Sequence, residues 1–193
     1  MCTLLRVRWT ITPRIPPQPW IACSGCGSSR PFQSSGRIRL NANGKKLDAW
    51  LIYKCVSCEK TWNRPLFERR NVRDIDPLVL DAMHRSDPDW VRKQEFDIDA
   101  LRRRTQQIEE CVDFDVSKET LAEGGPSSLE IELLVPLPTS LRLDRLLTAE
   151  LELSRSRLHA LYDEGRLRVT PERKDVLRRR IRDGMRIVWE GGT

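Results

Sequence analysis

Four cysteines occur as two pairs with the same internal spacing. Cys23 and Cys26 lie in "CSGCGSS", and Cys55 and Cys58 lie in "KCVSCEK", with 28 residues between the pairs. Two Cys-x-x-Cys turns that meet in space offer four thiolates, which form the closed tetrahedral shell of a structural zinc ion. Gly27, directly after the first pair, allows the tight turn that aims backbone N–H groups at the sulfurs. The spacing therefore predicts one structural Zn²⁺ bound by Cys23, Cys26, Cys55 and Cys58.

Two other interpretations of the cysteine pairs remain open. A redox centre requires the pair at the start of a helix, usually beside a strand–helix–strand pattern, and no such pattern surrounds either pair. Small buried thiols without a metal are the other alternative. Cys2 and Cys111 have no partner at matching spacing, so we expect neither to bind the metal. A four-sulfur shell has no open position, and the predicted site therefore does not indicate catalysis.

The segment between the pairs is predicted to be a β-hairpin. "RIRLNANGKKLDAWLIYKC" alternates apolar and polar residues on both sides of Asn43-Gly44, a strong signal of a two-residue loop. With this loop, the opposed pairs are Leu40–Leu47, Ile38–Ala49 and Arg39–Asp48. "TWNRPLFERR" is expected to supply a third strand, which gives the layout of a zinc ribbon.

The polar face of this hairpin is expected to be basic. Arg37 and Arg39 lie near Trp50 in the predicted hairpin, and arginine beside tryptophan can clamp phosphates and stack bases. Trp50 could instead pack under the N-terminal strand that contains Trp9, or against Trp62. The sequence leaves both roles open.

Short helices are expected in the acidic middle of the chain. Asp76 and Asp87 each precede a proline, which is the pattern of an N-cap followed by proline in the first turn. A third helix, highly charged and solvated, is expected to begin at Asp97 or Asp99 and to run through Ile108.

Strands and helices then alternate to the end of the chain. Two strands are expected on either side of a loop at Gly124-Gly125-Pro126. A stripe of leucines predicts a helix, Ser154 caps a second helix that ends at Gly165, and "RLRV" and "MRIVW" alternate as strands. The expected order is helix, short turn, helix, strand, loop, strand.

This last segment, "LRLDRLL…LSRSRLHALYDEGRLRV…IRDGMRI", resembles the alpha-L RNA-binding domain over about 50 residues. That domain occurs in the fourth small-subunit ribosomal protein, many pseudouridine synthases, tyrosyl-tRNA synthetases and a heat-shock ribosome-recycling protein. The resemblance implies that structured RNA is bound by Arg142, Arg145, Ser154, Arg155, Arg157 and Arg166. In "VTPERKD" the chain departs from the family pattern, since Pro171 stands where a hairpin glycine is usual, and a wider loop is expected.

The chain as a whole resembles a bacterial family catalogued as domain of unknown function 1062. The stretch from "CSGCGSSRPF" to "PLFERR" carries this resemblance. Membership implies a bacterial cytosolic protein and implies no particular activity.

Charge is distributed unevenly in this chain of net charge +6. Residues 1–70 carry a net charge of +10, residues 71–140 carry −8 and residues 141–193 carry +4. Basic ends suit phosphate backbones, although they can also serve solubility alone, and the acidic middle could pair with a basic end. No apolar run approaches the roughly 20 residues of a membrane span. Since arginines interrupt the short apolar patch at the N-terminus, no signal peptide is predicted and a cytoplasmic location is expected.

Together these features predict an α+β protein in three parts. The parts are a zinc-ribbon module at 1–70, an acidic helical connector at 71–112, and a β-hairpin with an alpha-L-like module at 113–193. The expected function is non-catalytic binding of structured RNA, either ribosomal or transfer RNA. DNA is less favoured because no recognition helix stands out, and no membrane partner is expected. The alternatives are a protein–protein adaptor or DNA-associated regulator, and an accessory part of an RNA-modifying enzyme, although no catalytic constellation is evident.

Overall fold

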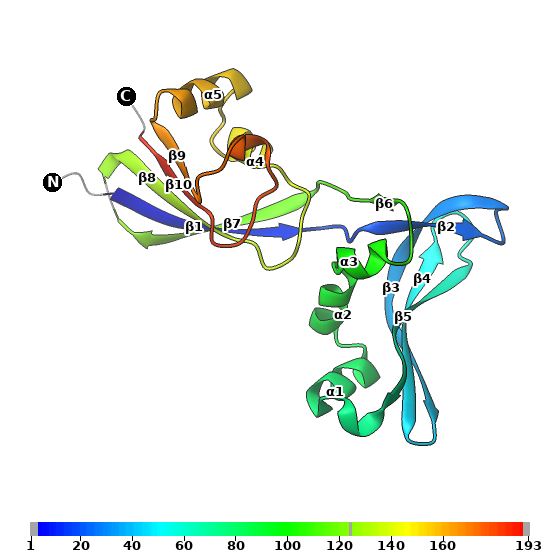
Figure 1. Cartoon of the computed structure of the whole chain (residues 1–193). Coiled ribbons are helices and arrows are strands. Elements are labelled where there is room, and N and C mark those ends of the chain that lie inside the picture. Colours follow the sequence, from blue (N-terminus) through cyan, green and yellow to red (C-terminus); the bar gives the residue numbers. More distant parts are fainter. Residues whose placement is uncertain (1–3, 124, 191–193) are drawn as a thin grey trace. The chain divides into compact units, whose positions relative to one another are not determined.

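The structure is a computed structural model that describes residues 4–123 and 125–190. The chain divides into two compact units. The terminal unit combines residues 1–15 with residues 112–193, and the central unit comprises residues 16–111. In the described residues, each unit has one five-stranded sheet and its own helices (Figure 1). The N-terminal strand therefore belongs with the C-terminal part of the chain and not with the cysteine pairs.

The terminal sheet has the strand order β7-β1-β8-β10-β9. Its strands are β1 (Leu4–Pro13), β7 (Phe114–Ala122), β8 (Gly125–Leu134), β9 (Leu167–Thr170) and β10 (Arg186–Trp189). β1 runs antiparallel to β7 and parallel to β8.

The expected hairpin between β7 and β8 is wrong, because β1 lies between these two strands. A central position buries the apolar residues of β1, and the side chains of Trp9 and Ile11 are 3% and 0% exposed. Gly124 of the expected loop lies outside the described residues.

Two helices and a 3₁₀ helix complete the terminal unit: α4 (Leu143–Glu150), α5 (Arg155–Asp163) and η2 (Val176–Arg178). The predicted order of helix, turn, helix, strand, loop and strand is confirmed. Ser154 caps α5, since its hydroxyl oxygen accepts a hydrogen bond from the Arg157 N–H at 3.1 Å. The loop after β9 is wide, as Pro171 suggested, and extends to β10 at Arg186.

The central sheet has the order β5-β4-β3-β2-β6. Its strands are β2 (Gln18–Cys23), β3 (Ser28–Asn43), β4 (Lys46–Cys55), β5 (Thr61–Asn71) and β6 (Ile108–Glu109), and a 3₁₀ helix η1 (Val72–Asp74) follows β5. The expected third strand at "TWNRPLFERR" is confirmed as β5.

The expected register of the β3–β4 hairpin is shifted by two residues. Asn43 pairs with Lys46 and Leu40 with Ala49, so the loop is Gly44-Lys45 and not Asn43-Gly44. Gly44 has φ +61°, and glycine at the first loop position is the preference of a type II′ turn. A shift by two keeps every side chain on its predicted face.

Three helices pack on one face of the central sheet: α1 (Pro77–Arg85), α2 (Pro88–Glu95) and α3 (Ile98–Arg102). Their caps were predicted correctly, since the side chains of Asp76, Asp87 and Asp97 accept backbone N–H groups at the three helix starts. The helices are part of the central unit and not a separate connector, because Met83, Val91 and Leu101 belong to its buried clusters.

The predicted extent of the third helix is wrong. α3 ends at Arg102, and β6 occupies Ile108–Glu109. The intervening turn is held by the Thr105 hydroxyl, which donates to the Trp20 carbonyl oxygen at 2.7 Å. A short, highly charged helix without a packed apolar face is only marginally stable, whereas β6 pairs with β2. None of the described helices is long and apolar enough to cross a membrane.

Candidate metal centre and candidate nucleic-acid interface

The four predicted ligands meet where strands of the central sheet end. Cys23 is the last residue of β2 and Cys55 the last of β4, and Cys26 and Cys58 lie in the turns that follow. The Cys23 and Cys58 sulfurs are 3.4 Å apart, and the Cys26 and Cys55 sulfurs are 3.9 Å apart. All four sulfurs lie within 4.8 Å of one another. The cluster could therefore hold a metal ion.

The two cysteine turns have the same backbone conformation. The Gly27 N–H donates to the Cys23 carbonyl at 2.9 Å, and the Glu59 N–H donates to the Cys55 carbonyl at 3.0 Å. Gly27 has φ +66° and Glu59 has φ +60°. The predicted role of Gly27 as the turn residue agrees with this geometry, and Glu59 takes the same left-handed conformation at a cost of about 1 kcal/mol.

Gly25 is required for a different reason, which the sequence did not reveal. A Cβ atom at this position would lie 2.9 Å from the Cys58 sulfur and 2.9 Å from Cγ of Lys60. Real Cβ contacts are longer than this, so only glycine lets the first turn approach the sulfur of the second turn.

Backbone N–H groups already favour one thiolate in the cluster. Burial raises the pKa of Cys55, but hydrogen bonds from the N–H groups of Ser57 and Cys58 and from neighbouring thiols outweigh it and lower this pKa to about 6. Hydrogen bonding with the Cys58 thiol, together with burial, raises the pKa of Cys26 to about 12. Metal binding requires deprotonated thiols, so the lowered pKa of Cys55 favours binding of a cation, whereas the raised pKa of Cys26 means that binding must displace its proton. Such a cluster suits a cation.

The two unpaired cysteines do not join the cluster. Cys111 is exposed and is not one of the four clustered thiols. Cys2 lies outside the described residues.

One face of the central sheet carries polar and aromatic side chains opposite the helix-covered face. Along β4, residues 47, 49, 51 and 53 are buried, whereas Trp50 and Ile52 between them are only half-buried. Trp50 lies opposite Arg39 on one side and Pro65 on the other. Trp50 belongs to none of the buried clusters among the described residues. The Trp50 side chain is therefore partly accessible on this face.

The two packing partners considered for Trp50 are both engaged elsewhere. Trp9 is 3% exposed in the core of the terminal unit. Trp62 lies opposite Tyr53, and the centres of these two rings are 5.4 Å apart. Tyr53 and Trp62 therefore share the helix-covered face, away from Trp50.

Beside Trp50 the sheet is hollowed into a shallow groove of about 530 Å³. Its lining includes Arg37, Ile52 and Lys54, and the Ser35 hydroxyl at its wall donates to the Ile52 carbonyl at 2.9 Å. The Arg37 and Arg39 side chains are exposed, and neither forms an ion pair with any described residue. The groove thus combines Arg37, unpaired among the described residues, and the Lys54 ammonium, which lies 3.9 Å from the Glu59 carboxylate, with the apolar side chain of Ile52.

The residues implied by the alpha-L resemblance are divided between engaged and free side chains. The Arg142 Nε donates to Asp144 at 3.1 Å, and Arg166 donates to the Glu190 carbonyl at 3.3 Å. Ser154 is occupied as the α5 cap. The three remaining side chains are exposed and form no ion pair within the described part of the chain; they are Arg145, Arg155 and Arg157.

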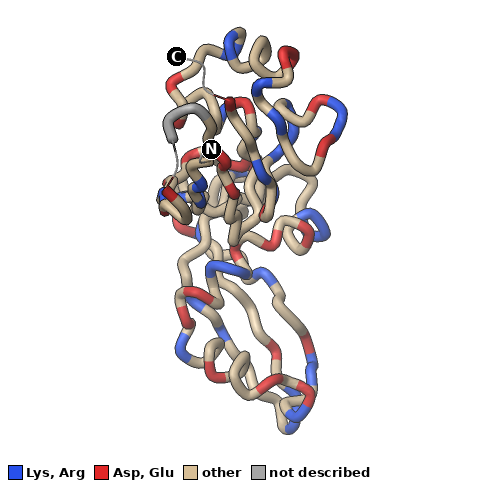
Figure 2. Tube along the Cα trace, turned by 90° about the vertical axis from the view of Figure 1, so that its left-hand side faces the viewer, with Lys and Arg blue, Asp and Glu red and all other residues tan. Residues whose placement is uncertain are grey.

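These arginines and the arginines of the groove belong to different units. Arg37 and Arg39 lie in the central unit, and the alpha-L-like residues lie in the terminal unit. Basic and acidic positions are interspersed along the chain trace (Figure 2). The strongly acidic middle segment seen in the sequence is therefore combined, in the central unit, with the basic β3–β4 hairpin.

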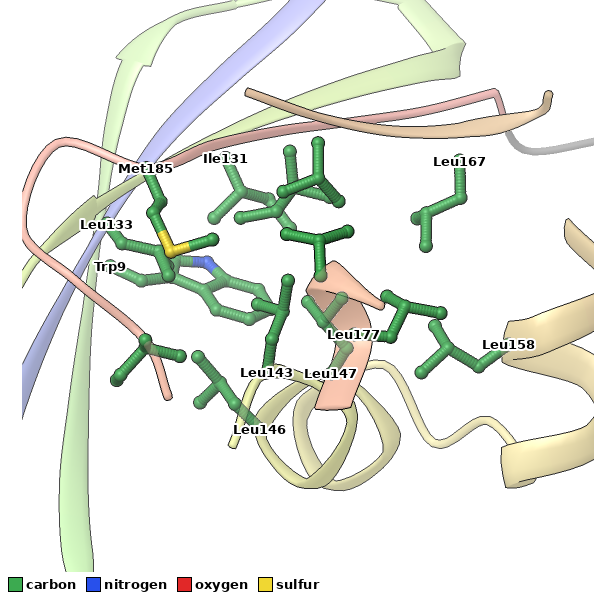
Figure 3. Close-up of a cluster of buried hydrophobic side chains, with 14 of the residues drawn as sticks. Trp9, Ile131, Leu133, Leu143, Leu146, Leu147, Leu158, Leu167, Leu177 and Met185 are labelled. Atoms are coloured by element: carbon green, nitrogen blue, oxygen red, sulfur yellow. The ribbon is translucent and has the colours of Figure 1, made fainter. Parts of the chain in front are cut away.

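The sequence did not identify a further cluster of arginines in the loop between β9 and β10. Arg173, Arg178, Arg179, Arg180 and Arg182 line a pocket of about 500 Å³ there. Buried Leu177 and Met185 of the same loop point into the terminal core, as Figure 3 shows. The alternation of arginines with isolated apolar residues in "DVLRRRIRDGM" was the signal that could have indicated an anchored loop.

Comparison with known proteins identifies one family. The model of a family described as "Protein of unknown function (DUF1062)" matches residues 40–173, a span that contains Cys55 and Cys58 and begins after Cys23 and Cys26. Neither the curated proteins nor the solved structures include a significant match to the chain. Since the family model covers well over half of the 193 residues, the chain belongs to the DUF1062 family.

Proposed function

We propose that the protein is a non-catalytic RNA-binding protein whose central unit is held together by one structural Zn²⁺. A tetrahedral Zn²⁺ with Zn–S bonds of about 2.3 Å separates its sulfurs by about 3.8 Å. The Cys23–Cys58 and Cys26–Cys55 sulfur distances, 3.4 and 3.9 Å, bracket this value. Four thiolates fill the coordination shell, so the metal would support folding and would have no position for substrate.

The accessible sheet face of the central unit is the observation that carries the RNA-binding proposal. Arg37 and Lys54 line its groove, and Arg39 lies opposite half-buried Trp50. Guanidinium groups bind phosphates, and an accessible aromatic ring stacks on unpaired bases with about 1–3 kcal/mol per base. The exposed Arg145, Arg155 and Arg157 at the starts of α4 and α5 would supply a second set of phosphate contacts. Two weak sites on one chain raise the apparent affinity for an RNA that reaches both.

Structured RNA with unpaired bases is the class of ligand that fits these features. Double-stranded RNA conceals its base faces, whereas loops and bulges present them to aromatic side chains. The protein would therefore bind ribosomal or transfer RNA at a loop, in the cytoplasm.

Fluorescence anisotropy with a labelled RNA stem-loop, measured from 50 to 300 mM salt, tests this proposal. Each phosphate contact contributes a slope of roughly 0.7–0.9 to the plot of log affinity against log salt. The variant Arg37→Gln/Arg39→Gln should lower this slope by about 1.5. The variant Trp50→Leu should weaken binding by about tenfold and leave the slope unchanged. A matched control is Arg73→Gln/Arg85→Gln, which removes two exposed arginines from the helical elements of the same unit.

Cell lysate on a sucrose gradient extends the test to natural RNA. We expect tagged protein to sediment with ribosomal particles or other RNA at low salt and to be released at moderate salt. Sedimentation at the top of the gradient without RNA at either salt, combined with no stem-loop binding at 50 mM salt, would reject the proposal.

A further inference from the structure

The loop between β9 and β10, residues 171–185, is firmly anchored although it has little regular structure. Its apolar residues Val176, Leu177 and Ile181 are 1%, 2% and 3% exposed, and they belong to the core of the terminal unit. Figure 3 shows Leu177 and Met185 in this core together with Trp9. While these apolar residues are buried, the arginines of the loop are exposed.

Backbone hydrogen bonds fix the loop on both sides of its arginine run. The Leu143 N–H at the start of α4 donates to the Arg179 carbonyl at 3.0 Å, and the Ile181 N–H donates to the Leu141 carbonyl at 2.9 Å. The Gly184 N–H donates to the Leu133 carbonyl of β8 at 2.9 Å. The run from Arg178 to Arg182 is therefore held in place before any ligand binds.

The loop encloses a pocket of about 500 Å³, which is within the usual range for small-ligand sites. Five arginine side chains line it, at positions 173, 178, 179, 180 and 182, together with apolar Val176 and Met185. Asp183 is the acidic member of the lining, and its carboxylate already accepts the Val135 N–H at 2.8 Å. The pocket therefore has a large excess of positive charge.

Most of this charge has no partner in the protein. Arg173, Arg178 and Arg182 form no ion pair with any described residue, and the Arg179 Nε donates to the Lys174 carbonyl at 2.8 Å. Gathering like charges in a concave site is unfavourable unless an anion binds there. Guanidinium groups match phosphate oxygens in pairs, and the three without an ion pair among the described residues already offer more donors than a single phosphate requires.

We propose that this pocket binds adjacent phosphates carried by a nucleoside, with the phosphates on the arginines and the base against Pro171, the exposed apolar residue of the lining. A compact polyanion fits a concave pocket better than an extended duplex backbone does. Two sources share this chemistry, a free nucleoside diphosphate and the 5′-diphosphate end of an RNA chain. The proposal is independent of the RNA-binding function proposed above, because it uses different residues and a different ligand group.

Isothermal titration of the full-length, zinc-loaded protein in 50 mM NaCl tests the pocket. The probes are ADP, pyrophosphate, adenosine, and one RNA 10-mer prepared with either a 5′-diphosphate or a 5′-hydroxyl. ADP and pyrophosphate should show saturable binding at one site, and adenosine should show none. The affinities of the two RNA 10-mers and of ADP identify the natural ligand. If the 5′-diphosphate RNA binds more tightly than ADP, the ligand is an RNA end; if ADP binds more tightly, the ligand is a free nucleotide.

The pocket variant is Arg178→Gln/Arg182→Gln, and the control is Arg168→Gln/Arg186→Gln, which removes the same charge from two exposed positions on β9 and β10 that do not line the pocket. Loss of two charged hydrogen-bond donors should weaken ADP binding at least tenfold, whereas the control should change it less than twofold. Arg178→Lys keeps the charge and should still weaken binding, since lysine cannot form the paired contact. Absence of saturable binding to ADP and pyrophosphate at millimolar concentration, or an equal loss in pocket and control variants, overturns the proposal. Binding of the 5′-hydroxyl RNA reports on the separate RNA-binding function, so the two proposals can fail independently.

Discussion

Removal of the proposed Zn²⁺ should unfold the central unit and leave the terminal unit folded. Structural Zn²⁺ binds to small cysteine domains with about 10–16 kcal/mol at neutral pH, which is as large as the whole unfolding free energy of an ordinary domain, about 5–15 kcal/mol. Cys23 and Cys55 are also members of the buried cluster that contains Phe32 and Tyr53. Opening the sulfur shell therefore disturbs the core directly, whereas the core of the terminal unit contains none of these residues.

Substitution of a single cysteine of the cluster should remove part of the stability that the central unit would lose without the metal. An equal share of the zinc binding energy among four ligands is about 2.5–4 kcal/mol for each cysteine. Cys55→Ser tests the most favoured thiolate, because Cys55 is 1% exposed and has its pKa lowered to about 6. Cys111→Ser is the matched control, since this exposed cysteine of the same unit is not in the cluster.

Hydrogen exchange with mass spectrometry gives the required resolution along the chain. After chelation, and more weakly in Cys55→Ser, peptides from residues 16–111 should lose protection, and peptides from residues 112–190 should keep it. Elemental analysis should find one zinc per wild-type chain. Unchanged protection of the central unit in a verified metal-free sample would refute the reasoning, as would unaltered metal content in Cys55→Ser.

Three further substitutions test local features of the central unit. Gly25→Ala should lower zinc affinity and the melting temperature of the central unit, because its Cβ would meet the Cys58 sulfur at 2.9 Å; a calorimetric scan equal to wild type would show that the turns can separate freely. Glu59→Gly should stabilise the same unit by up to about 1 kcal/mol in urea unfolding, since φ +60° suits glycine; destabilisation would contradict the strain assigned to this turn. Arg64→Met should cost about 1–3 kcal/mol by urea unfolding, because Arg64 is 1% exposed and donates to the buried Tyr53 hydroxyl at 3.3 Å and to a carbonyl of α2 at 2.7 Å. If Arg64→Met instead raised stability, desolvation of the guanidinium would outweigh its hydrogen bonds.

The cysteine pairs of the candidate metal site could be predicted from the sequence because their signal is local. Each Cys-x-x-Cys turn places its two sulfurs together by itself, and Gly27 already marked the left-handed turn residue. The role of Gly25 could not be predicted in this way, since it depends on the distance to a sulfur of the other turn, more than 30 residues later.

The accessible face around Trp50 was only partly predictable. Alternation along the hairpin placed Arg39 and Trp50 on one face, and the two-residue error in register left that face unchanged. Whether Trp50 would be covered depended on which strand and which helices packed nearby, and these are distant parts of the chain. The arginine pocket was missed because its shape depends on bonds from residues 171–185 to α4 and β8.

The sequence by itself determined the cysteine cluster, the three Asp-capped helix starts, the Ser154 cap and the side-chain faces of the hairpin. Each of these depends on hydrogen bonds or side-chain alternation within a few residues, which local sequence specifies. Only the tertiary structure decided that β1 separates β7 from β8, that the acidic helices complete the central unit, and that five arginines surround one pocket. These features depend on which of several apolar strands and faces become partners. Which strands and faces become partners depends on how well surfaces from distant parts of the chain pack together, and this cannot be predicted from local sequence.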